Sequence, residues 1–163
     1  MRRTIVGVMG PGTGASRTDL ANARRLGALL AREGWVVLCG GRGVGVMDAV
    51  CKGAQEAGGL TVGVLPGDDA RAASEAVDVV IVTGLGNARN AVNVLSSDVV
   101  VACGMGSGTA SEIALALKSD KDVIILSDHA EAIDFFRVIG KDRVAVARDP
   151  DEVIAIARRL LGR

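Results

Sequence analysis

Residues 89–112 read RNAVNVLSSDVVVACGMGSGTASE: a basic residue, an apolar strand, and a glycine-rich turn that opens a helix carrying a carboxylate. A turn of this kind leaves backbone N–H groups free at the start of the helix, where the helix dipole favours negative charge. The stretch therefore predicts a phosphate site at residues 104–109. Arg89, before the strand, and Glu112, one turn into the helix, are expected to converge on the ligand that the phosphate anchors.

Apolar runs rich in valine and isoleucine recur along the chain and predict buried parallel strands. They lie at residues 4–9, 35–39, 60–65, 77–82, 98–103, 122–126 and 143–147. Helical patterns lie between most of them, at residues 19–33, with Thr18 as the N-cap, and at 44–57, 87–96, 109–118, 130–138 and 151–161. Strands that alternate with helices indicate an α/β protein with a Rossmann-like, doubly wound sheet, mostly parallel, and helices on both faces.

The composition fits one domain. The 163 residues are 49% hydrophobic, enough for one buried core, and no linker, repeat or low-complexity tract stands out. We therefore expect residues 1–163 to form a single Rossmann-like domain that binds phosphate or nucleotide. The formal net charge is zero and only Trp35, Phe135 and Phe136 are aromatic. Both features argue against a partner that is nucleic acid or a membrane surface.

The cysteines and the amino terminus bear on the compartment. Cys39, Cys51 and Cys103 form no CxxC motif, and an odd number of cysteines fits a reducing compartment better than a disulfide framework. No signal-peptide pattern and no apolar run of membrane-spanning length occurs. We therefore expect free thiols and a cytoplasmic protein. The chain lacks Walker A, GxSxG and HExxH motifs, and no metal site is predicted.

Four glycine-rich loops follow the first, second, fourth and fifth strands, and loops after parallel strands share one edge of the sheet. They are residues 10–16 (GPGTGAS), 40–45 (GGRGVG), 84–89 (GLGNAR) and 104–109 (GMGSGT). We predict that three of these loops bind the ligand, through Gly10, Pro11, Gly12, Ser16, Gly40, Gly41, Arg42, Gly106, Ser107, Gly108 and Thr109. The polar segment 67–76 is expected to be a mobile loop or short helix beside the site.

Each motif also has a simpler interpretation. Residues 10–15 match the GxGxxA form of a dinucleotide fingerprint, but residues 39–42 (CGGR) lack the carboxylate that a nicotinamide dinucleotide site uses. The glycines of residues 40–45 could form a tight turn without a ligand. Glu112 could simply complement the helix dipole, and Arg89 could be a solvated helix residue.

The motifs resemble those of the Rossmann-like superfamily that includes the Lonely Guy phosphoribohydrolases, proteins often labelled possible lysine decarboxylases. Its signature is a GG turn after the second strand, an arginine, and PGGxGTxxE. The matching pieces here are Gly40 and Gly41, Arg89, and GMGSGTASE at residues 104–112. Within the superfamily the chain most resembles molybdenum cofactor carrier proteins, through GVMGPG, GWVVLCGGRGVGVMDAV, GLTVGVLPG and GNARNAVNVLSSDVVVACGMGSGTASEIALALK.

The resemblance implies a carrier or storage protein with the molybdenum cofactor (molybdopterin) as its cargo, held by its phosphate. Carrying a pterin phosphate needs hydrogen-bond donors but no lowering of a reaction barrier. The alternative is an enzyme, a nucleoside 5′-monophosphate phosphoribohydrolase of the cytokinin-activating type, which would cleave the N-glycosidic bond with Glu112 and Arg89. A nucleotide-binding sensor module is a third interpretation.

The resemblance also bears on chemistry and partners. The chain has only four lysines, none in a pyridoxal-phosphate context, so lysine decarboxylation is not expected. Relatives of this family are homo-oligomers, and we expect a dimer or tetramer. Molybdenum enzymes and cofactor-synthesis proteins are the protein partners that the resemblance implies.

Overall fold

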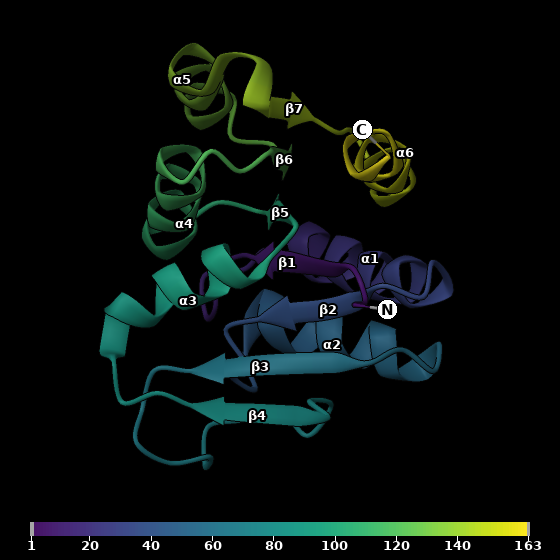
Figure 1. Ribbon diagram of the computed structural model, residues 1–163, viewed down its shortest axis with the longest axis vertical. Coiled ribbons are helices and arrows are strands. Elements are labelled where there is room, and N and C mark those ends of the chain that lie inside the picture. Colours follow the sequence, from purple (N-terminus) through teal and green to yellow (C-terminus); the bar gives the residue numbers. More distant parts are fainter. Residues whose placement is uncertain (1, 163) are drawn as a thin grey trace.

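Strands and helices alternate in the computed structural model, which describes residues 2–162, except that the strands at residues 61–65 and 79–82 follow one another without a helix between them (Figure 1). The strands are β1 (Ile5–Met9), β2 (Val36–Cys39), β3 (Thr61–Leu65), β4 (Val79–Val82), β5 (Val99–Cys103), β6 (Val123–Leu126) and β7 (Val144–Val146). The helices are α1 (Arg17–Arg32), α2 (Gly45–Glu56), α3 (Arg89–Ser96), α4 (Ser107–Lys118), α5 (Ala130–Gly140) and α6 (Pro150–Leu161), with short 3-10 turns η1 (Gly86–Ala88) and η2 (Lys141–Arg143). Each predicted element is found within a few residues of its expected bounds.

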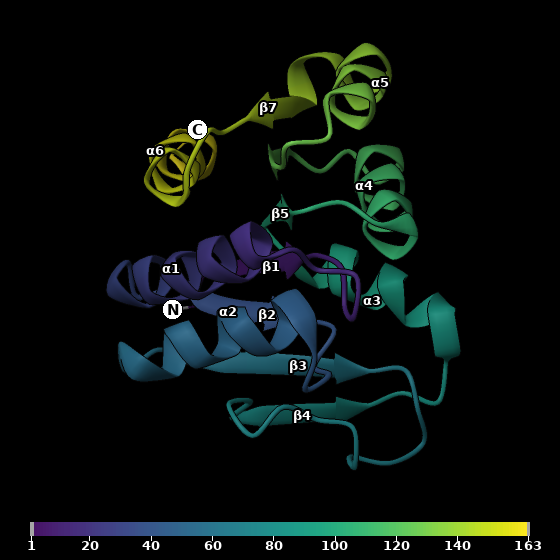
Figure 2. The same ribbon diagram turned by 180° about the vertical axis from the view of Figure 1, so that it is seen from behind.

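The strands form one sheet in the order β4-β3-β2-β1-β5-β6-β7, and all neighbouring strands are parallel. Helices α1, α2 and α6 cover one face and α3, α4 and α5 the other (Figures 1 and 2). The doubly wound fold expected from the sequence is therefore confirmed. After β4 the chain returns to the other side of β1, so the loops after β1 and β5 diverge and leave a crevice at the carboxyl edge of the sheet.

Two aliphatic cores fill the space between the sheet and its helices. Strand β5 shows how the pleat divides its side chains: Val99 and Val101 join the core under α1, α2 and α6, while Val100 and Ala102 join the core under α3, α4 and α5. A strand buried on both faces carries apolar residues at every position. This explains why the sequence shows continuous runs here and no alternation of apolar with polar residues.

Helix α1 begins earlier than predicted. The N-cap is Ser16, and not Thr18, because the Ser16 hydroxyl accepts a hydrogen bond from the Asp19 amide at 3.0 Å. The Asp19 carboxylate in turn accepts from the Ser16 amide at 2.9 Å. This reciprocal capping box satisfies two amide groups that the helix start leaves free, which a threonine two residues later would not do.

Strand β4 is not buried as predicted. It is an edge strand of the sheet. Its four residues, Val79, Val80, Ile81 and Val82, are between 36% and 45% exposed. Apolar periodicity alone does not distinguish a central strand from an edge strand. Whether a strand is covered on both sides depends on its place in the sheet, and that place is set by which strands pair. Segment 67–76 contains no helix and packs its backbone against the β2–α2 loop.

Cys39, Cys51 and Cys103 are buried free thiols. Within residues 2–162, no helix is both long and apolar enough to cross a membrane.

Candidate functional site

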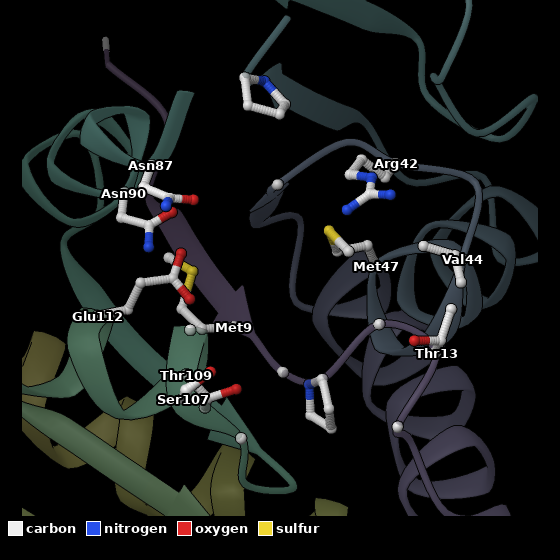
Figure 3. A pocket seen from close by; sticks show the side chains of 18 of the residues that line it. Met9, Thr13, Arg42, Val44, Met47, Asn87, Asn90, Ser107, Thr109 and Glu112 are labelled. Atoms are coloured by element: carbon white, nitrogen blue, oxygen red, sulfur yellow. The ribbon is translucent and has the colours of Figure 1, made fainter. Parts of the chain in front are cut away.

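A pocket of about 430 Å³ lies at the carboxyl edge of the sheet, where the loops after β1, β2, β3 and β5 meet the start of α3 (Figure 3). Most of the predicted site residues line it: Gly10, Pro11, Gly12, Gly40, Arg42, Arg89, Gly106, Ser107, Gly108, Thr109 and Glu112. Segments far apart in the sequence thus meet at the crevice that the sheet topology creates.

Ser16 and Gly41 do not line the pocket. The Ser16 hydroxyl caps α1. Gly41 has a φ of 76°, and a Cβ there would lie 2.9 Å from the backbone of Gly63 in β3. Gly41 therefore lets the chain leave β2 close to its neighbouring strand, and both residues have structural roles.

Several lining residues were not assigned individually from the sequence. They are Val8, Met9, Thr13, Gly14, Val44, Met47, Pro66, Asn87 and Asn90. Thr13 and Gly14 belong to a loop that the sequence singles out, so their position in it was a usable signal. Met9 and Met47 are apolar residues of a strand and a helix, and their sequence pattern is that of core residues.

The first turn of α4 forms one wall of the pocket. Its N-cap, Gly106, is extended and makes no capping hydrogen bond through a side chain, so the first amides of the helix are left without that partner. Thr109 is 2% exposed, and its Oγ1 has no hydrogen-bond partner within residues 2–162. A buried hydroxyl without a partner is costly, and a bound oxyanion would satisfy it together with the free amides.

Glu112 lies one turn further along α4 and is 6% exposed. Its Oε1 accepts a hydrogen bond from Asn93 Nδ2 at 3.0 Å. Burial raises the pKa of Glu112, and the Asn93 hydrogen bond and the charge of Arg89 only partly oppose this shift. Asn93 lies one turn after Arg89 on α3, so helical spacing from Arg89 was the signal that could have identified it.

Arg89 reaches from α3 to the end of β2. A Cβ on Gly40 would lie 2.9 Å from Arg89 Nη1, so glycine at that position leaves room for the guanidinium group. Nη1 donates to Asn90 Oδ1 at 2.9 Å, and the buried Nε has no partner within the described chain. Burial lowers the pKa of Arg89, although the Glu112 carboxylate opposes this shift. The predicted pair therefore meets at the pocket, but Arg89 and Glu112 form no ion pair among residues 2–162.

Similarity to known proteins identifies the family of this chain. The model of the SLOG cluster4 family matches residues 3–154. The chain belongs to the SLOG cluster4 family. It is 43% identical to an uncharacterized protein of Archaeoglobus fulgidus over 77% of this chain and 82% of that one.

Two solved structures resemble this SLOG cluster4 protein over its whole fold. The molybdenum cofactor binding protein from the phototrophic bacterium Rippkaea orientalis is 53% identical, with a TM-score of 0.98 over 99% of both chains. The molybdenum cofactor carrier protein of Chlamydomonas reinhardtii is 50% identical, with a TM-score of 0.94 over 99% of this chain and 100% of that one. The resemblance to molybdenum cofactor carrier proteins that the sequence motifs indicate is therefore confirmed.

The raised pKa of Glu112 predicts a pH-dependent stability difference. A carboxyl whose pKa is higher in the folded than in the unfolded state contributes stability below its unfolded pKa, and this contribution is lost as pH rises through the folded pKa. Glu112→Gln keeps the shape but cannot ionise. We expect it to raise the melting temperature by about 2–4 °C at about pH 7.5, and to have little effect near pH 4.

Thermal unfolding monitored by circular dichroism at the two pH values checks this expectation. Glu33→Gln is the matched control, because the hydrogen bond from Arg158 lowers the pKa of Glu33, so this substitution should not stabilise the protein at neutral pH. A Glu112→Gln variant that melts below the wild type at neutral pH would show that ionised Glu112 stabilises the fold.

Proposed function

We propose that this protein binds the molybdenum cofactor as a carrier or storage protein, and that the amino-terminal turn of α4 holds the cofactor's phosphate. The observation that carries the proposal is the buried Thr109 hydroxyl, which lacks a partner within residues 2–162 and lies in the wall of the pocket beside uncapped amides. Hydroxyl and amide donors at a helix start are the groups that bind phosphate in proteins.

The β1 loop supports the same phosphate position. A Cβ on Gly106 would lie 3.5 Å from Pro11 Cβ, so the β1 loop borders the start of α4. The Pro11 carbonyl accepts a hydrogen bond from the Val46 amide at 3.0 Å, which ties this loop to α2. The backbone of residues 10–12 is therefore held beside the α4 amides, where it forms part of the proposed phosphate site.

Size and similarity support the pterin ligand. A pocket of about 430 Å³ falls within the range of small-molecule and cofactor sites. The Rippkaea orientalis and Chlamydomonas reinhardtii proteins are described as molybdenum cofactor binding and carrier proteins, and this chain shares about half of its residues with each. The inference from them to this chain rests on that identity and on the pocket together.

The test is saturable binding of the cofactor under anaerobic conditions, followed by its release on denaturation and detection as the fluorescent oxidised pterin. The carrier proposal expects one saturable site in the wild type. A wild type that binds no cofactor at about 100 μM, which corresponds to a binding free energy weaker than about −5.5 kcal/mol, would contradict it.

A second candidate is favoured by one observation, the buried Glu112 carboxyl with its raised pKa in the same pocket. A buried carboxyl with a raised pKa is better suited than an exposed one to donate a proton to a leaving base. If the protein is a phosphoribohydrolase, the wild type releases free base from AMP and Glu112→Ala loses this activity by about 100-fold or more. Chromatographic detection of adenine measures it, and a wild type inactive on several nucleoside monophosphates would exclude this candidate.

A further inference from the structure

The pocket has two regions that can bind an anion, the uncapped amides at the start of α4 and the Arg42 side chain. Ser107, Thr109 and Glu112 from α4 lie on one side, and Arg42 and Met47 from the β2–α2 region lie on the other (Figure 3). A phosphate bound by the α4 amides leaves Arg42, on the other side of the pocket, available for another part of the ligand. The β2–α2 loop and the start of α4, which the sequence assigns to one phosphate, thus line opposite sides of the same pocket.

Arg42 is held in place by its backbone. It forms an antiparallel bridge with Ala73, and the neighbouring Gly43 amide donates to the Ala72 carbonyl at 2.9 Å. The Ser74 amide donates to the Gly41 carbonyl at 2.9 Å, and its hydroxyl donates to Asp48 Oδ1 at 2.7 Å. The irregular segment after β3 thus braces the loop that carries Arg42. The backbone of Arg42 is therefore fixed beside the pocket before any ligand binds, which lowers the cost of ordering this loop.

The charges of this side of the pocket are not balanced by the protein. Arg42 forms no ion pair with any carboxylate of residues 2–162. The buried guanidinium of Arg89 lies against Gly40, two residues before Arg42 in the β2 loop, and its Nε lacks a partner within residues 2–162. Glu112 is the one carboxylate among the described lining residues, and it bonds to Asn93. Two guanidinium groups thus face the pocket with one carboxylate.

We propose that the pocket recognises a ligand with two separate anionic groups: a phosphate at the start of α4, and a second anionic group at Arg42 and Arg89. This inference rests on the proposed function. In the molybdenum cofactor the second group is the metal-bearing dithiolene, whose sulfur and oxo ligands accept hydrogen bonds. Guanidinium donates several N–H bonds in a plane and suits such a group. Arg42 therefore distinguishes the complete cofactor from a pterin that carries phosphate alone.

The experiment compares two probes on three variants. The probes are the metal-bearing cofactor and neopterin monophosphate, which has the pterin and a phosphate but no dithiolene. Arg42→Ala should weaken binding of the cofactor about 10- to 100-fold and leave binding of neopterin monophosphate within about twofold. Thr109→Val should weaken both probes by a similar factor, because it acts on the phosphate that they share.

Arg71→Ala is the matched control. Arg71 is an exposed arginine of the same bracing segment, is paired with Asp69, and lies outside the pocket. The substitution removes one positive charge outside the pocket, so it should leave the affinities for both probes unchanged. Fluorescence titration of neopterin monophosphate and anaerobic equilibrium dialysis of the cofactor give the dissociation constants.

The outcomes separate this inference from the carrier proposal. If Arg42→Ala weakens both probes equally or weakens neither, the second anionic site is overturned while cofactor binding by the wild type still supports the carrier function. If the wild type binds neither probe, the carrier function itself is overturned. A selective loss of cofactor affinity in Arg42→Ala, absent from Arg71→Ala, supports the two-anion pocket.

Discussion

Gly27→Ala is expected to destabilise the protein by about 3 kcal/mol, although alanine favours a helix by about 1 kcal/mol over glycine. The reason is the crossing of α1 and α2. A Cβ on Gly27 would lie 2.0 Å from the Val50 carbonyl oxygen, and a Cβ on Gly53 would lie 1.8 Å from the Arg24 carbonyl oxygen. Both obstacles are backbone atoms within helices, so one side chain cannot move aside and the two helices must separate.

Thermal and urea unfolding measure this effect, and the melting temperature of Gly27→Ala should fall by about 6–12 °C. Gly53→Ala is expected to behave in the same way. Gly108→Ala is the matched control, because Gly108 also lies in a helix but a Cβ there meets no atom within 4 Å. It should leave stability unchanged or increase it. Equal melting temperatures for Gly27→Ala and the wild type would contradict the close crossing of the helices.

Ser107→Asp is expected to weaken phosphate binding strongly, without loss of stability. The dissociation constant of neopterin monophosphate should increase by about 100-fold or more. Ser107 is the first residue of α4, is exposed and lines the pocket. A carboxylate there complements the helix dipole, which stabilises the fold by a few tenths of a kcal/mol, and repels a phosphate dianion from the same amides. The substitution therefore distinguishes an effect on ligand affinity from an effect on the stability of the fold.

Fluorescence titration and thermal unfolding of the same preparations test both parts. Ala114→Asp adds the same charge at an exposed position of the same helix outside the pocket, and it should leave the affinity within about threefold because exposed charges beyond about a Debye length are screened. If Ser107→Asp binds neopterin monophosphate as the wild type does, the start of α4 is not the phosphate site.

The candidate site shows how far sequence patterns reach. Glycine-rich turns after apolar runs predict which loops meet, because parallel strands send all their carboxyl ends to one edge. The hydrogen-bond partners of the side chains at the site were harder to predict from sequence patterns. The hydrogen bond between Asn93 and Glu112 joins residues of two helices, and Ser16 was assigned to the ligand although its hydroxyl caps α1. A hydroxyl near a phosphate loop has the same local sequence context in either role.

The sequence by itself determined the alternation of strands and helices and the positions of the glycine-rich turns, because periodicity and glycine content act over a few neighbouring residues. Only the tertiary structure decided the order of the strands, which leaves β4 exposed at the edge and places Arg42 across the pocket from α4. It also decided the contact of α1 with α2 at Gly27 and Gly53. These features depend on which distant segments pack together, and burial and charge balance are properties of that packing.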